Sequence, residues 1–180
     1  MQGSICAGEF EGTHVLRFLG DVRVTLCASL DAYCDHMLGD ANFHAVIVDL
    51  EHTENLDSTA LGCLARLSIR VKSIHQRVPT LICNSHNLRR VLESMGFHDV
   101  FMIVDREAYA AMSLPALPES IELPAGTDLA IESTRARVIS AHKQLMALNA
   151  TNAETFKDLV AALEQEQTSS AVAGQVKAEG

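Results

Sequence analysis

Two hydroxyl side chains and a carboxylate stand together in the run Leu56-Asp57-Ser58-Thr59-Ala60-Leu61-Gly62. A β-branched apolar run precedes them and a helical apolar pattern follows, so they lie where a strand passes into a helix. A helix N-terminus presents unpaired backbone N–H groups and a partial positive charge. A hydroxyl there caps the helix or accepts a phosphoryl group, because the same N–H groups tolerate an anion. Ser58 is therefore the principal candidate residue.

The histidines and cysteines offer less chemistry. The eight histidines form no HxxxH pair and the five cysteines have no CxxC spacing, so we expect no metal site. The chain has no GxSxG sequence and no glycine-rich phosphate loop, which argues against an enzyme and against a cofactor. We expect His142, inside a helical stretch, to be solvated or at the edge of an apolar seam. The thiols are expected to be free and buried or semi-buried, and buried thiols are usually inert.

Composition and charge restrict the class of partner. The 180 residues are 48% hydrophobic and 21% charged, which is ordinary for a globular protein. The net charge of −9 argues against nucleic acid and against anionic membrane surfaces as partners. No stretch has the length of a transmembrane helix, and the N-terminus lacks the features of a signal peptide, so we expect a cytoplasmic protein without a membrane partner.

Strands and helices alternate over residues 1–112, which we interpret as one domain. The expected strands are residues 5–10, 13–20, 45–50, 80–83 and 100–104. The expected helices are residues 25–38, 57 or 58 to 74, 87–95 and 105–112. Gly20 is expected to end the second strand, and Gly39 and Gly96 to end helices. This order predicts a small, mainly parallel sheet covered by helices.

The last third of the chain has a different composition. Residues 113–126 hold three of the four prolines, which indicates a linker. Residues 127–166 carry two amphipathic stretches with a break at 149–152, where Thr151 and Glu154 match a capping box. They predict a helical αα-hairpin. Residues 167–180 are rich in Ser, Ala, Gly and Gln and are predicted to be a disordered tail.

The first domain resembles the STAS family, which includes anti-sigma factor antagonists and the tails of sulfate transporters. Three stretches carry the resemblance: the strand at 46–50 followed by Asp57-Ser58-Thr59, the turn at 20–22, and the helix and strand at 91–97 and 100–101. The resemblance covers roughly residues 5 to 112. It implies a STAS-like α/β fold with a mixed, mainly parallel sheet, to which the C-terminal hairpin is added.

The resemblance also implies a function. In the family, antagonists bind an anti-sigma factor that is a serine kinase, and this kinase switches them off by phosphorylating the motif serine. Ser58 takes the position of that phosphoacceptor, with Thr59 as a secondary hydroxyl. The implied partner-binding residues are Asp21, Arg23, Asp57, Ser58, Thr59 and Leu61. The family usually has glycine at Ala60 and an acidic residue at Arg23. Alanine fits the first turn of a helix, while Arg23 either alters partner choice or pairs with phosphorylated Ser58.

The sequence therefore predicts an anti-sigma factor antagonist that acts in stress transcription. Its expected partner is a protein, either an anti-sigma factor with serine kinase activity or a phosphatase. A kinase that is linked to a response regulator is one form of this expectation. Two alternatives stay open: a constitutive STAS scaffold or transporter accessory subunit, and a nucleotide-binding module. A homodimer through the C-terminal hairpin is a further expectation.

Overall fold

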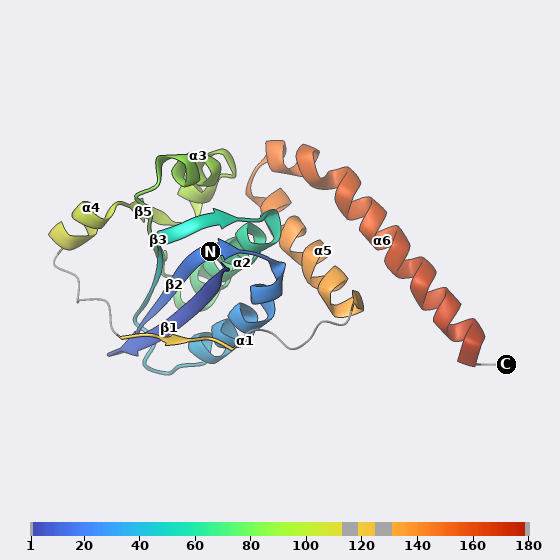
Figure 1. Ribbon diagram of the computed structural model, residues 1–180, viewed down its shortest axis with the longest axis horizontal. Coiled ribbons are helices and arrows are strands. Elements are labelled where there is room, and N and C mark those ends of the chain that lie inside the picture. Colours follow the sequence, from blue (N-terminus) through green and yellow to red (C-terminus); the bar gives the residue numbers. More distant parts are fainter. Residues whose placement is uncertain (1, 113–118, 125–130, 179–180) are drawn as a thin grey trace.

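A computed structural model describes residues 2–112, 119–124 and 131–178 of the chain (Figure 1). The strands are β1 (Ser4–Phe10), β2 (Thr13–Val22), β3 (Ala45–Leu56), β4 (Thr80–Ile82), β5 (Met102–Val104) and β6 (Ile121–Glu122). The α-helices are α1 (Cys27–Leu38), α2 (Ser58–His75), α3 (His86–Ser94), α4 (Arg106–Ala111), α5 (Ile131–Leu148) and α6 (Ala150–Ala178). Two 3-10 turns, Val24–Leu26 and Phe97–Asp99, precede α1 and β5.

The strands form one sheet in the order β5-β4-β3-β2-β1-β6. The neighbours from β2 to β5 pair in parallel, and β1 pairs antiparallel with β2 and with β6. This mixed, mainly parallel sheet confirms the predicted fold class. The edge strand β6 lies within residues 113–126, where composition indicated a linker. Sequence reasoning missed it because two residues carry no periodicity.

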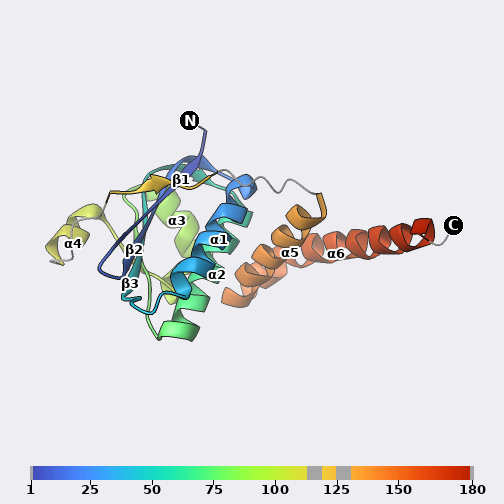
Figure 2. The ribbon, with the colours of Figure 1, turned by 90° about the horizontal axis from the view of Figure 1, so that it is seen from below.

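Helices cover the two faces of the sheet unequally. Figure 2 shows α1 and α2 on one face and the short α4 on the other. In β3, Val48 and Leu50 belong to the main hydrophobic core, whereas Ile47 packs in a smaller cluster with Tyr109 of α4. The alternation follows from the strand geometry, since successive side chains point to opposite faces. Residues 46–50 are buried throughout, as predicted for a strand covered on both sides.

Charged side chains fasten α4 to its face of the sheet. Arg106 donates from Nη2 to Asp49 Oδ2 at 2.8 Å and from Nε to Glu51 Oε2 at 2.8 Å. Asp49 is buried, so the guanidinium compensates a carboxylate that has lost its water. The hydrogen bond from Arg106 to Glu51 lowers the pKa of the Glu51 carboxyl. Asp105 caps α4, as predicted, by accepting from the Ala108 amide at 2.7 Å.

Both strands that lead to the candidate serine are longer than predicted. β2 continues past Gly20 to Val22, so the prediction that Gly20 ends the strand is wrong. Gly20 instead adopts a φ of 63° at a shift in the pairing register between β2 and β3. Glycine takes this conformation without strain, so the strand bends there and continues. Gly39 and Gly96 do follow helix ends, as predicted.

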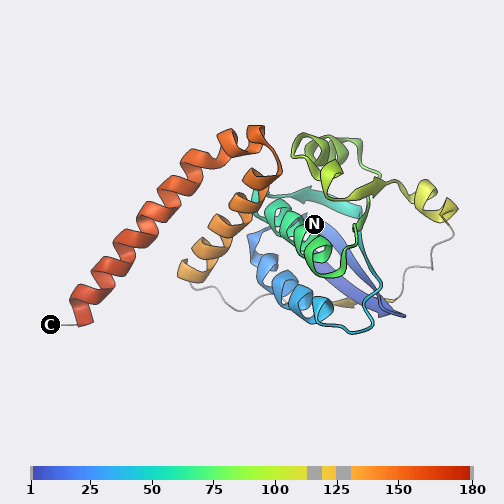
Figure 3. The ribbon, with the colours of Figure 1, turned by 180° about the vertical axis from the view of Figure 1, so that it is seen from behind.

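The C-terminal hairpin is packed onto the domain. α5 lies against α2, and α6 lies on the far side of α5 (Figures 2 and 3). Ala141, Leu145 and Phe156 of the hairpin belong to the main core cluster.

The second helix of the hairpin departs from the sequence pattern at both ends. The Asn149 side chain caps α6 by accepting from the Asn152 amide at 2.8 Å, so the prediction of a capping box at Thr151 is wrong. α6 runs through Ala178 and so includes most of residues 167–180, for which composition predicted disorder. Alanine, the strongest helix former, recurs through this stretch.

Candidate functional site

The predicted site lies at the edge of the sheet where β2 and β3 end together. The two strands are parallel neighbours, and Val22 pairs in register with Leu56. The residues that follow each strand therefore meet, although more than thirty positions separate them in the sequence. This geometry brings the predicted pair Asp21 and Arg23 beside the predicted pair Asp57 and Ser58.

Asp57 joins the two segments. Its Oδ1 accepts a hydrogen bond from the Ala60 amide at 2.7 Å and so caps α2. Its Oδ2 accepts from the Val24 amide at 2.9 Å, in the turn that follows β2. The Asp57 amide in turn donates to the Val22 carbonyl at 3.2 Å. One carboxylate thus starts the helix and fixes the neighbouring loop, so Asp57 and not Ser58 is the N-cap.

Arg23 is the most exposed of the predicted site residues, with 64% of its side chain accessible. Its Nε donates to Asp21 Oδ2 at 2.7 Å, and this hydrogen bond lowers the pKa of the Asp21 carboxyl. Asn55 donates to the other oxygen of the same carboxylate at 3.4 Å. The guanidinium is therefore held at the rim of the site by its own loop.

Ser58 is the half-buried first residue of α2, and its hydroxyl lies 2.9 Å from Nε2 of His142 in α5. The other ring nitrogen, Nδ1, lies 2.8 Å from the Val138 carbonyl oxygen. A carbonyl only accepts, so Nδ1 carries a proton, and in the neutral imidazole Nε2 then accepts from the serine hydroxyl. His142 is 2% exposed, so the prediction of a solvated or edge histidine is wrong.

The remaining predicted residues point inward. Thr59, Ala60 and Leu61 are all buried, at 5%, 1% and 3% exposure. Ala60 fits the first turn of α2, as expected where the family usually has glycine. Thr59 and Leu61 pack on the buried side of α2, so in this conformation their side chains are not part of the surface.

The described residues hold no cluster of three or more His, Cys, Asp or Glu side chains that could bind a metal ion. Cys27, Cys34, Cys63 and Cys83 are buried free thiols, and burial raises the pKa of Cys34 to about 12. Cys6 is partly buried, so the positions of all five thiols agree with the expected burial. None of the helices in the described ranges is long and apolar enough to cross a membrane.

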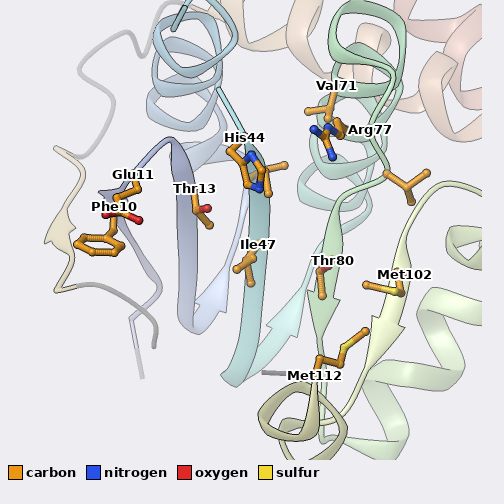
Figure 4. A pocket seen from close by; sticks show the side chains of 13 residues that line it. Phe10, Glu11, Thr13, His44, Ile47, Val71, Arg77, Thr80, Met102 and Met112 are labelled. Atoms are coloured by element: carbon orange, nitrogen blue, oxygen red, sulfur yellow. The ribbon is translucent and has the colours of Figure 1, made fainter. Parts of the chain in front are cut away.

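A separate pocket of about 550 Å³ lies at the other end of the parallel strands, where they begin (Figure 4). It opens where β4 and β5 begin, and Thr80, Met102 and Met112 line it together with Arg77. Ser58 follows the other end of β3, so this pocket does not belong to the Ser58 site. Its lining is mainly apolar, which differs from the backbone cradle that a nucleotide phosphate requires.

The comparisons with known proteins agree with this architecture. The STAS domain model matches residues 7–110, more than half of the chain, so the chain belongs to the STAS domain family. The match ends before the hairpin, and His142 therefore comes from outside it.

Two solved structures share the fold. One is the anti-sigma factor antagonist SpoIIAA in its unphosphorylated form, with 15% identity and a TM-score of 0.51 over 61% of this chain and 94% of that chain. The other is the Bacillus cell fate determinant SpoIIAA in the phosphorylated form, with 15% identity and a TM-score of 0.51 over 62% of this chain and 100% of that chain. At this identity the likeness concerns the fold. A comparison with curated proteins found no match.

Proposed function

We propose that this chain is a non-enzymatic regulator of the anti-sigma factor antagonist type, which binds a protein partner around Ser58 and is switched by phosphorylation of that serine. The observation that carries the proposal is the position of Ser58. It starts α2 at the carboxyl edge of the sheet, directly after the capping residue Asp57 and beside the ion pair of Asp21 and Arg23 at the end of β2.

The proposed partner is an anti-sigma factor with serine kinase activity, and a phosphatase would restore the unmodified serine. The pathway would control sigma-factor-dependent stress transcription in the cytoplasm. In one form of the proposal, the kinase is linked to a response regulator. The similar structures support this assignment, because one is named as an anti-sigma factor antagonist and the other is a phosphorylated form. The partner surface would consist of the exposed Arg23 and the half-buried Asp21, Asp57 and Ser58, and the buried Thr59 and Leu61 would lie beneath it.

The helix terminus explains how phosphate could switch binding without unfolding the domain. The N–H groups of the first turn of α2 and the helix dipole favour an anion at Ser58. A phosphoryl group adds about −1.5 to −2 charges and three acceptor oxygens to a surface that already carries Asp21 and Asp57. It would therefore block a partner by charge and bulk while the domain remains folded.

Incubation of the full chain with lysate of its own cells and ATP tests the proposal. Phosphate mapped by mass spectrometry should fall on Ser58 and disappear in Ser58→Ala, while Thr59→Ala keeps it. A tagged chain should retrieve a kinase from the same lysate, and Ser58→Asp should retrieve at least tenfold less of it. Phosphate on Thr59 alone would move the switch to that residue.

Other outcomes would support the alternatives. A transporter subunit retrieved equally by wild type and Ser58→Asp would support a constitutive scaffold or accessory role. Saturable thermal stabilisation by ATP or GTP would support a nucleotide-binding module. Light scattering of the full chain measures its molar mass and so tests the homodimer. The two copies would meet through the C-terminal hairpin, at the face of α6 that points away from α5.

A further inference from the structure

The hydroxyl that would receive the phosphate is covered by the chain's own C-terminal hairpin. The Ser58 hydroxyl donates to His142, whose ring is itself backed by Phe156 of α6 in an edge-on contact at 5.0 Å. A phosphoryl group on Ser58 Oγ needs the space that the imidazole fills. A phosphate in the present position of the hydroxyl would therefore press against the imidazole, and a kinase would have to reach Ser58 Oγ past α5.

The backbone of α5 is pressed against α2 next to this hydrogen bond. Gly62 lies one turn after Ser58, on the same face of α2. A Cβ at Gly62 would lie 2.5 Å from the carbonyl carbon of Ala141 and 2.7 Å from its Cα. Side chains do not separate the two backbones at Gly62, so the turn of α5 that carries Ala141 and His142 is held close to the start of α2. For a phosphate on Ser58, this part of α5 has to move away from α2.

Polar contacts along α5 hold the hairpin in this position. Arg66 of α2 donates to Ser140 Oγ at 3.2 Å and is hydrogen-bonded to Asp31 of α1. Arg137 of α5 lies 3.5 Å from the same Asp31 carboxylate. These partly exposed contacts are reversible, because water replaces them at little cost when the helix leaves.

The far end of the hairpin has its own anchor. The Asn152 side chain donates to the carbonyls of Met95 and Leu145, both at 2.9 Å. This anchor lies away from Ser58, at the junction of α5 and α6. The hairpin is therefore attached at two places, and only one of them meets the serine.

We propose that the α5–α6 hairpin is a displaceable cover of Ser58, and that its docking on α2 and phosphorylation of Ser58 exclude each other. The inference rests on the proposed function and adds a form of regulation to it. Docking of the hairpin slows phosphorylation, and the phosphate prevents the hairpin from docking again. The coupling is the same in both directions, because linkage between two binding events is reciprocal.

The first test places the phosphate directly. Phosphoserine is incorporated at position 58 of the full chain, and hydrogen–deuterium exchange is followed over residues 131–148. Exchange in α5 should accelerate at least tenfold over the unmodified chain. The matched control carries phosphoserine at Ser73, an exposed residue about 22 Å further along the same helix, and should not change α5. If α5 stays as protected with phosphoserine at 58 as without it, the cover is refuted.

The second test moves the hairpin without touching Ser58. Gly62→Ala should undock α5 and raise the rate of Ser58 phosphorylation in lysate with ATP at least tenfold. Gly39→Ala is the matched control, since its Cβ would lie 3.5 Å from the nearest atom, an ordinary contact. An unchanged phosphorylation rate in a Gly62→Ala chain whose α5 exchanges rapidly would refute the cover. Absence of phosphate on Ser58 in every chain would contradict the proposed function, and the phosphoserine exchange experiment would then decide the cover alone.

Discussion

The hydrogen bond between Ser58 and His142 predicts a measurable coupling between the two residues. Ser58→Ala removes the hydroxyl and leaves Nε2 of a 2% exposed imidazole without a donor. The cost of an unsatisfied buried acceptor is about 1–3 kcal/mol. Alanine returns about 0.5 kcal/mol as the better helix former at this position. The variant should therefore lose about 0.5–2.5 kcal/mol of unfolding free energy.

The same substitution behaves differently when the imidazole is absent. In a His142→Leu background no imidazole accepts from position 58, so Ser58→Ala should stabilise by about 0.5 kcal/mol. The difference between the two backgrounds, about 1–3 kcal/mol, is the coupling energy of the pair. It isolates the hydrogen bond from the packing change that His142→Leu causes alone.

Urea unfolding of the four full-length chains measures this coupling. With a denaturant dependence of about 2 kcal/mol per molar urea, the coupling corresponds to a midpoint difference of about 0.5–1.5 M. Far-UV circular dichroism and tyrosine fluorescence should give coincident transitions, so that one free energy describes each chain. A coupling below about 0.5 kcal/mol is indistinguishable from independent sites and would refute the contact between α2 and α5.

Three further predictions concern the elements around the site. Asp57→Ala should lose about 0.5–2 kcal/mol of unfolding free energy in urea because α2 loses its cap, while Asp57→Asn should lose less, since the amide oxygen still accepts. Leu145→Ala should lose about 2–5 kcal/mol, and a loss below about 1 kcal/mol would contradict the burial of α5. Arg106 lowers the pKa of Glu51, so this pair stabilises the fold above the ordinary value of 4.5 and ceases to do so as the pH falls further. Urea midpoints at pH 6 and pH 3.5 should therefore differ less in Glu51→Gln than in wild type.

The position of the site in the fold followed from the sequence because local patterns determine it. The apolar run at 45–50 and the helical pattern after Asp57 place Ser58 at the end of a buried strand. Parallel neighbours end at the same edge of a sheet, so the turn after β2 had to lie nearby. The true end of β3 was not predictable in this way, since residues 51–55 do not alternate and form a strand only through their pairing with β2.

The contact between Ser58 and His142 could not be predicted from local patterns. The two residues are 84 positions apart, and a histidine beside an apolar seam is usually solvated. A weaker signal was present, because His142 lies four residues after Val138 and three before Leu145, on the buried side of α5. Gly62, one turn after Ser58, is a second signal, since a glycine inside a helix permits close approach of another backbone.

The strength of the cover has to lie within limits if the switch is to work. Each 1.4 kcal/mol of docking free energy lowers the uncovered fraction tenfold, so docking stronger than about 4 kcal/mol would leave fewer than about one chain in a thousand open to a kinase. Contacts near Ser58 suit a weaker attachment. Gly62, Ala141 and Ser140 bury little side-chain surface there, and the ion pairs of Asp31 are partly hydrated. The larger apolar side chain of Leu145, one turn after His142, and the Asn152 anchor at the start of α6 lie toward the junction of the two helices, where they would keep the hairpin attached while its contact with Ser58 opens.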